Sequence, residues 1–203
     1  MEPSMIDPAV LGVDGIAVSI ATTATVELTW FSDETSARLD DGQFTTGQGP
    51  VFDAIADHDP IQCRDLTKTT RWPAFTDHAL GIGVHAVFAF PMIIGPTCVG
   101  AMLCHRRNSG PMSDDGIATA MALASLLRAQ TLTWVPGRND PKPAEFHRAE
   151  VHQAAGIVSA HLDAPVNDAL ARMRAYTFAH QRALVDVARD VIAGRLRLPS
   201  DAA

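Results

Sequence analysis

A proline-rich segment divides the sequence into two parts that differ in charge and in hydrophobic periodicity. Residues 135–143 contain three prolines and a glycine, a composition that cannot continue a helix. Residues 1–143 contain nine Lys or Arg and 16 Asp or Glu, whereas residues 144–203 contain seven of each. The chain's net charge of −7 therefore comes entirely from the first part. A protein that coats nucleic acid as a general polycation is excluded, so any nucleic-acid contact must be local.

The first part alternates runs typical of strands with runs typical of helices, which predicts an α+β fold. Two β-branched runs, residues 16–20 and 25–30, predict a hairpin. Two nearly continuous apolar runs, residues 86–94 and 98–104, are joined by Gly95-Pro96 and predict central strands of a second hairpin. A short strand is expected at residues 60–63, and helices at residues 51–57, 74–80 and 114–133, the last capped by Ser113.

The order of these elements and of several short motifs resembles a GAF domain over about residues 12–134. The motifs are Gly49-Pro50, Asp65-Leu66, Arg71-Trp72-Pro73, Gly83-Val84-His85-Ala86-Val87, Phe90-Pro91 and Val99-Gly100-Ala101-Met102-Leu103. The resemblance implies an antiparallel sheet flanked by helices, with a sensory and dimerising role. The resemblance implies no particular ligand, so we expect the input signal to be either a small molecule or a protein.

The second part shows apolar residues at intervals of three and four, which predicts three amphipathic helices in a compact bundle. The first is expected from Phe146 to Leu162, the second from Val166 through Met173 to Thr177 or Phe178, and the third from about Ala183 to Leu196. Pro165 suits the first position of the second helix. Residues 135–144 are then a linker between a domain at 12–134 and a domain at 145–198.

The helical part resembles an ANTAR domain, a three-helix RNA-binding module of bacterial antitermination regulators. The residues that carry the likeness are Val151-His152-Gln153-Ala154-Ala155-Gly156-Ile157-Val158, Asp168-Ala169-Leu170-Ala171-Arg172-Met173-Arg174-Ala175, Leu184-Val185-Asp186-Val187-Ala188 and Val191-Ile192. Two positions depart from the family pattern. Ala155 stands where many ANTAR domains carry a lysine, and Pro165 stands where a polar cap is usual. The missing cation removes one phosphate contact from the salt-sensitive part of RNA affinity.

The two resemblances together imply a transcription antitermination regulator in which the GAF domain responds to a signal and the ANTAR domain binds RNA. In such a protein, a homodimer presents two ANTAR bundles to tandem hairpins of a nascent transcript. The alternative from a different class is a ligand-sensing GAF protein whose helical tail serves only for dimerisation or partner binding. A positive face spanning the arginines of the tail favours RNA binding, and arginines that are scattered or tied to acids favour the alternative.

The candidate RNA-binding residues lie on the predicted helices of the tail, and each has a plain structural interpretation beside the functional one. They are Gly156, Arg172, Arg174, Tyr176, Arg182 and Arg189. The arginines either contact phosphates and bases or remain solvated and paired with acids. Tyr176 lies four residues after Arg172, and either stacks on a base or packs half-buried. Gly156 costs about 1 kcal/mol relative to alanine in a helix, so a closely packed helix or an RNA backbone is expected beside it.

Other functional classes are not favoured by the sequence. We expect no enzyme, because no nucleophile sits in a recognisable motif, and no cofactor or metal. Cys98 and Cys104 lie on one face of a strand by parity and are expected to be buried thiols. The sequence has no stretch of about 18 apolar residues, so no membrane partner is expected and the predicted location is the cytoplasm. A dimer seam is expected on the alanine-rich helix Ile117 to Thr131, with Ala118, Met121, Ala122, Ala124, Ser125 and Leu126.

Overall fold

The chain folds into two compact units, Met1–Lys142 and Pro143–Ala203. The structure is a computed structural model that describes residues 6–21, 26–131 and 148–199. The two units meet in sequence within the proline-rich segment 135–144, which lies outside the described residues. Each unit is therefore considered by itself.

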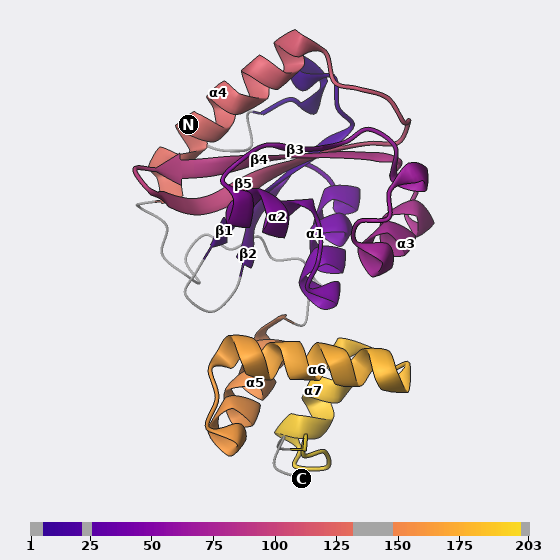
Figure 1. Ribbon diagram of the computed structural model, residues 1–203, viewed down its shortest axis with the longest axis vertical. Helices are drawn as coiled ribbons and strands as arrows, with labels where there is room; N and C mark the ends of the chain where they lie inside the picture. Colours follow the sequence, from indigo (N-terminus) through magenta and orange to yellow (C-terminus); the bar gives the residue numbers. More distant parts are fainter. Residues whose placement is uncertain (1–5, 22–25, 132–147, 200–203) are drawn as a thin grey trace. The chain divides into compact units, whose positions relative to one another are not determined.

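The first unit is built on one five-stranded antiparallel sheet (Figure 1). Its strands are β1 (Gly15–Ala21), β2 (Val26–Phe31), β3 (Ile61–Cys63), β4 (Ala86–Ile94) and β5 (Thr97–Arg106). Their order in the sheet is β2-β1-β5-β4-β3, and each neighbouring pair is antiparallel. Both predicted hairpins are confirmed, because β1 pairs with β2 and β4 pairs with β5. The apolar runs of β4 and β5 lie inside the sheet, where both faces of a strand are covered.

Helices cover both faces of this sheet, and the alternation of side chains along β4 assigns each residue to one face. On one face, Phe88, Phe90 and Met92 pack beneath helix α4 (Asp114–Thr131) and the 3-10 helix η2 (Pro8–Leu11). On the opposite face, Val87 and Ala89 pack against the helices of the other layer. That layer contains α1 (Glu34–Thr46), α2 (Pro50–Asp57), α3 (Pro73–Gly81) and the 3-10 helix η3 (Leu66–Lys68). The unit therefore has two apolar cores, one on each side of the sheet.

A β-bulge changes the predicted relation between two cysteines. Met92 pairs with Gly100 but Ile93 pairs with Cys98, so β5 contains one extra residue at Val99. Val99 and Cys104 both pack with the core beneath α4, whereas the thiol of Cys98 donates a hydrogen bond to the Gly100 carbonyl at 3.2 Å. The prediction that Cys98 and Cys104 share a face by parity was wrong, because an inserted residue reverses the alternation.

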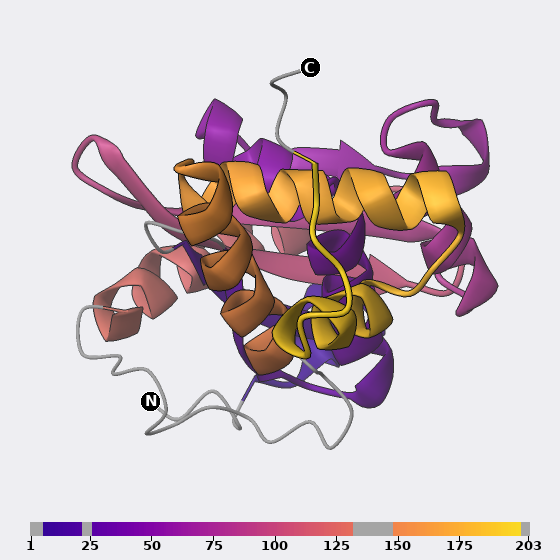
Figure 2. The ribbon, with the colours of Figure 1, turned by 90° about the horizontal axis from the view of Figure 1, so that it is seen from below.

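The second unit contains three helices, α5 (Arg148–Leu162), α6 (Val166–His180) and α7 (Leu184–Ile192), joined by short connections (Figure 2). Their shared core consists of small and medium apolar residues: Val151, Ala154, Ala155, Val158, Ala169, Leu170, Met173, Leu184, Val187, Ala188 and Val191. The sequence predicted either Thr177 or Phe178 as the last residue of the apolar face of α6. Thr177 faces the core and Phe178 is 81% exposed, so the residue is Thr177. Pro165 is the residue before α6 rather than its first helical position.

The third helix is shorter than predicted. It ends at Ile192 instead of Leu196, because Gly194 adopts a left-handed conformation with φ of 69°. The backbone amides of Arg195 and Leu196 then both bond to the Asp190 carbonyl, which closes the helix end.

Candidate functional site

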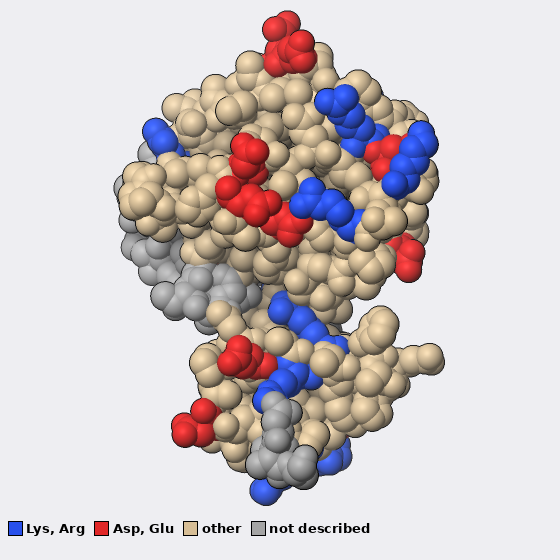
Figure 3. Space-filling view, in the orientation of Figure 1, with Lys and Arg blue, Asp and Glu red and all other residues tan. Residues whose placement is uncertain are grey.

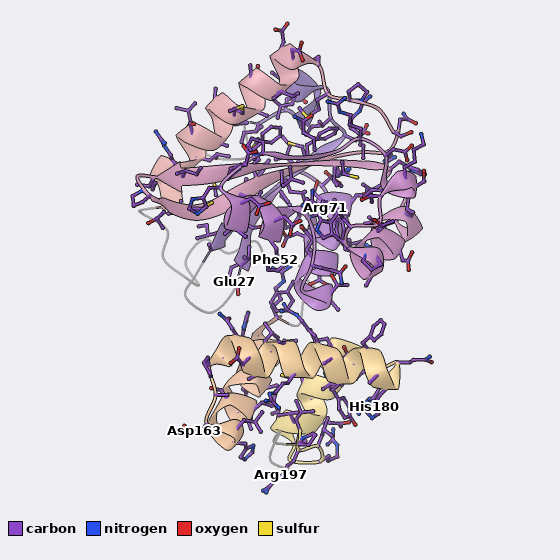
Figure 4. The ribbon with its side chains drawn as sticks, viewed as in Figure 1. Glu27, Phe52, Arg71, Asp163, His180 and Arg197 are labelled. Carbon is purple, nitrogen blue, oxygen red and sulfur yellow. The ribbon has the colours of Figure 1, made fainter. Side chains whose placement is uncertain are left out.

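One edge of α6 carries a stacked pair of aromatic rings beside an arginine. The rings of Tyr176 and His180 lie 3.9 Å apart between centroids, at an interplanar angle of 16°. The Nδ1–H of His180 donates to the Tyr176 carbonyl at 2.9 Å, which fixes the ring at the end of α6 (Figure 4). Arg172 lies one turn before Tyr176 on the same side of the helix. These three side chains, spaced at four residues, form a half-exposed edge that we call the α6 aromatic edge.

Arg182 extends this edge beyond the end of α6 but is held by an acid. Its guanidinium lies 2.6 Å from the Asp190 carboxylate, and hydrogen bonding to Asp190 and then to Tyr176 raises its pKa. Asp190 is also bonded by Arg195 at 2.7 Å. The hydrogen bonds from Arg182 and Arg195 lower the pKa of Asp190. The arrangement holds Arg182 next to Tyr176 and neutralises part of its charge.

Arg189 joins two helices of the bundle instead of projecting as a separate cation. Its Nε donates to Glu150 on α5 at 2.8 Å, and its Nη1 lies 3.8 Å from Asp186 one turn earlier on α7. All three side chains are partly exposed, and exposed ion pairs of this kind contribute about 0.2–1 kcal/mol to stability. Arg189 therefore has a structural partner on each side.

Arg174 lies on a different side of α6 from Arg172, since two positions correspond to about 200° of helix rotation. It is half-buried, and this burial together with the nearby charge of Arg148 lowers its pKa to about 10. The guanidinium still stays charged at neutral pH. Arg148 and Arg174 thus place two positive charges near each other at the junction of α5 and α6.

The four candidate arginines therefore do not form the single positive face that would favour RNA binding, and scattered or acid-paired arginines are the arrangement expected for the alternative, an association module. Arg172 and Arg174 point to different sides, and Arg182 and Arg189 are paired with acids. On the visible face of the bundle, acidic side chains lie among the basic ones (Figure 3). The α6 aromatic edge is the part of this unit where two stacked rings and an arginine lie on one side of a helix.

Gly156 is exposed on α5, and its surroundings differ from the expectation of close helix packing. A Cβ atom added at this position meets no heavy atom within 4 Å. The helix therefore bears the conformational cost of a glycine without an internal packing reason among the described residues. The space above Gly156 remains open for a partner to approach the backbone.

The first unit contains a buried polar group that the sequence did not reveal. Ser36, at the start of α1, lies within hydrogen-bond distance of His105 Nε2 on β5, at 3.1 Å. The Ser36 hydroxyl donates to Asp33 at 2.6 Å, so it accepts the Nε2–H of His105. Proton donation thus runs from His105 to Ser36 to Asp33. Since the serine proton points away from the histidine and Ser36 is fully buried, the group is not arranged as an activated nucleophile.

This group fastens α1 to the sheet where β1 begins and β5 ends. Asp33 is the N-cap of α1, and its side chain accepts from the Ser36 amide at 3.0 Å and from the Ser32 hydroxyl at 2.7 Å. Burial raises the pKa of Asp33, but the His105 ring, Ser36 and Ser32 together hold it well below its usual range. Gly15 is required beside the group, because a Cβ there would lie 2.1 Å from an Asp33 oxygen.

Comparison with known proteins identifies the fold of the first unit. No protein-family model matches the sequence, and no curated protein matches it. Among solved structures, the chain is similar to the GAF domain of a two-component sensor histidine kinase from Bacillus halodurans. The identity is 14% and the TM-score is 0.50, over 62% of this chain and 85% of that one. The GAF domain/HD domain protein from Geobacter sulfurreducens is 17% identical, with a TM-score of 0.49, over 61% of this chain and 83% of that one.

The first unit has the GAF fold. The antiparallel sheet with helices on both faces is the architecture that the sequence motifs predicted. The similarity to the Bacillus halodurans domain shows this fold and nothing further. Among the described residues of the GAF unit and the helical unit, no group of three or more His, Cys, Asp or Glu could hold a metal ion. Within the same residues, no helix is long and apolar enough to cross a membrane.

Sequence reasoning missed several residues of these sites. His180 was not a candidate, although its spacing of four from Tyr176 was a usable signal. Arg148 was missed because its neighbour Arg174 lies on another helix. Ser36 and His105 are 69 residues apart, so only the sheet brings them together.

Proposed function

We propose that this protein is a signal-responsive regulator in which the GAF unit controls RNA binding by the helical unit. The observation that carries the proposal is the α6 aromatic edge, where Tyr176 is stacked on His180 beside Arg172. Single-stranded RNA loops are recognised by stacking of splayed bases on aromatic rings and by arginine contacts to phosphates. A narrow edge of this kind suits a hairpin loop better than a long duplex, whose recognition requires an extended basic surface.

The proposed role of this edge follows from the resemblance of residues 145–198 to an ANTAR domain. We propose that two copies of the chain form a homodimer and hold tandem hairpins in a nascent transcript, which prevents a terminator from forming. Two weak sites in one dimer gain affinity through their effective concentration, which suits the modest positive charge of each bundle. Gly156 supports the same proposal, because its open surface permits a close approach of the RNA backbone.

The GAF unit is proposed to receive the signal, as a small molecule or as a contact with another protein. We propose no catalytic role for it. The Ser36–His105–Asp33 group has its proton donation directed toward Asp33 and has no exposed serine, which supports a structural function for these three residues.

The proposal is tested by measuring the binding of tandem-hairpin RNAs to the full chain at two salt concentrations. Tyr176→Ala removes the stacking ring, and we expect an affinity loss of about 5- to 150-fold, the loss that corresponds to one stacked base. Arg172→Ala should weaken binding and reduce the salt dependence by about one phosphate contact.

Two controls keep this experiment specific. Arg38→Ala removes an exposed arginine from α1 of the GAF unit and should leave RNA binding unchanged. Arg189→Ala removes an arginine of α7 that contacts Glu150 on α5 and is not part of the α6 aromatic edge, so its effect should be smaller than that of Arg172→Ala. Equal losses in all arginine variants would indicate a response to net charge alone and would contradict a localised RNA site.

A second function is favoured by a specific observation. Arg182 and Arg189 lie in ion pairs, and the helical part has no net charge, which suits a bundle that assembles with a protein partner. In that case the chain is a ligand-sensing GAF protein with an association module. A folded protein that binds none of the hairpin RNAs, with or without GAF ligands, would support this alternative.

A further inference from the structure

The outward face of α4 in the GAF unit is apolar although it is exposed. Residues 116–127 contain no charged side chain. Met121 is 49% exposed and Leu126 is 59% exposed, and they lie on opposite flanks of the exposed side of α4, since five positions correspond to about 140° of helix rotation. A helix that is apolar all round is normally buried on all sides. The composition of α4 therefore indicates that its outward face has a partner.

The inward face of α4 is already occupied by the sheet. Ala120, Ala124 and Leu127 are buried in the core with residues of β4 and β5. Figure 1 shows α4 lying along one face of the sheet. Ala124 was expected in a dimer seam, and this was wrong, because its side chain is 1% exposed and belongs to the core. The partner of the outward face must therefore contact other residues.

Five exposed residues follow one line along α4 at the spacing used by paired helices. They are Asp114, Ala118, Met121, Ser125 and Arg128, at intervals of four, three, four and three. This alternation is the heptad spacing of a two-helix seam. The line has small residues on either side of a central methionine, and such residues allow two helices to approach closely.

The charges at the two ends of this line decide which partner fits. Asp114 lies in the first turn of α4 and Arg128 in the last turn, and Arg128 Nη1 is held there by the Ile93 carbonyl at 2.8 Å. The midpoint between residues 114 and 128 is Met121. A second α4 running in the opposite direction therefore places its Arg128 beside Asp114 and its Ser125 beside Ala118. A parallel copy would place acids beside acids and bases beside bases.

We infer that α4 is the seam of an antiparallel dimer of two copies of this chain, with the two-fold axis at Met121. The inference rests on the homodimer of the proposed function and adds its surface and its direction. The same patch on both copies is self-complementary, as a two-fold interface requires. The opposed helix dipoles also favour the antiparallel arrangement.

Cysteine crosslinking tests the direction of the seam in the full chain. The background is Cys63→Ser, since Cys63 is the half-buried cysteine and the other two are buried. Met121→Cys should form a disulfide-linked dimer under mild oxidation, because residue 121 meets its own copy at the axis. Ala118→Cys alone should not crosslink, because the two copies of residue 118 lie roughly 9 Å apart along the helices, beyond disulfide reach. Ala118→Cys combined with Ser125→Cys should crosslink.

The outcomes separate this inference from the RNA proposal. Crosslinking of Ala118→Cys and Ser125→Cys as single variants would show a parallel seam and overturn the inference. A dimer by light scattering in which none of these cysteines crosslinks would place the interface elsewhere and would also overturn it. A monomeric chain would reject the homodimer itself. RNA binding is read separately through Tyr176→Ala, so either proposal can fail without the other.

A charged substitution on the seam gives a second measurement without oxidation. Met121→Glu introduces two like charges at the axis and should halve the mass measured by light scattering, from two chains to one. Because Met121 is exposed, the circular dichroism of the GAF unit should not change. The matched control is Thr119→Glu, an exposed position of α4 outside the line, which should leave the mass unchanged. An unchanged mass for Met121→Glu would contradict the seam.

Discussion

The GAF unit and the helical unit use polar side chains in opposite ways. In the GAF unit, Ser36 and His105 are fully buried and join a helix to the sheet. In the helical unit, Tyr176, His180 and the arginines lie on the surface or half-buried, and the core contains apolar residues and Thr177. A buried hydrogen-bonded group specifies a fold, whereas a half-exposed group remains available to a ligand. The comparison indicates an architectural role for the buried group of the GAF unit, whereas the surface group of the helical unit is the one that we propose to bind RNA.

The cores of the two units also differ, in the size of their side chains and in the sequence separation of the residues that form them. The GAF core is formed by pairing of distant strands and contains large side chains such as Phe88 and Phe90. The helical core is formed by residues close in sequence, and alanine and valine are most of it. Each unit has its own core, so a core substitution should act within one unit.

Truncation of a core residue in each unit should change stability most, and it tests whether the two cores are independent. Phe88→Ala should lower the stability of the GAF unit by about 3–5 kcal/mol, and Met173→Ala should lower that of the helical unit by about 2–5 kcal/mol. Hydrogen exchange read by mass spectrometry should show faster exchange in β1, β4 and β5 for the first variant and in α5–α7 for the second. Faster exchange throughout both units in either variant would show that they share one folding transition.

Asp33→Asn should have a smaller effect that depends on pH. Asparagine still caps α1 but loses the charge that Ser32 and Ser36 stabilise, a loss of about 1 kcal/mol at neutral pH. Because the folded-state pKa of Asp33 is lowered, this stabilisation is complete above the unfolded-state pKa of about 3.9 and is lost as pH falls further. Denaturant titrations at pH 7, 5 and 3 should therefore show the variant and the wild type converging at the acid end.

The matched control for this measurement is Asp7→Asn. Asp7 also caps a helix, by accepting from the Ala9 amide at 2.9 Å, but it lies on the exposed 3-10 helix η2. Its substitution should change stability little at any of the three pH values. A constant difference between Asp33→Asn and the wild type down to pH 3 would contradict a charge-based role for Asp33.

Gly156→Ala should change stability least, and it also tests whether RNA binding by the helical unit uses this glycine. The added methyl group meets open space, so the helical unit should become more stable by about 0.5–1 kcal/mol. The matched substitution Gly194→Ala should destabilise the same unit, since φ at Gly194 is 69°. Thermal melting measures both. Weaker RNA binding by the more stable Gly156→Ala variant would show that a ligand needs the glycine, and unchanged binding would remove Gly156 from the site.

Much of the fold was predictable because its signals are local. The apolar runs of β4 and β5 with Gly95-Pro96 between them predicted a hairpin, and the structure pairs them. The three-and-four spacing of the tail predicted three helices, and α5, α6 and α7 occupy those segments. The same spacing predicted that Tyr176 shares a face with Arg172. In each case the periodicity of the backbone determines which side chains lie together.

The site was less predictable because its charges are set by residues on other helices. The pairing of Arg189 with Glu150 joins residues 39 positions apart, and no pattern along the chain indicated it. The sequence therefore left open whether the four arginines form one positive face or are tied to acids, and this pairing is one reason why no single face forms. The bulge at Val99 likewise reversed the relation of Cys98 to Cys104, because strand register depends on the neighbouring strand.

The composition of the segment between the two units, the strands and helices, and the uncharged run of residues 116–127 could be predicted from the sequence alone, since they follow from the order of residues. The pairing of the arginines and the exposed side of α4 depend on how the chain folds in three dimensions. Folding also brings Ser36, His105 and Asp33 into one hydrogen-bonded group. The physical reason is that hydrogen bonds and ion pairs act over a few ångströms, and folding alone brings residues from distant parts of the chain within that range.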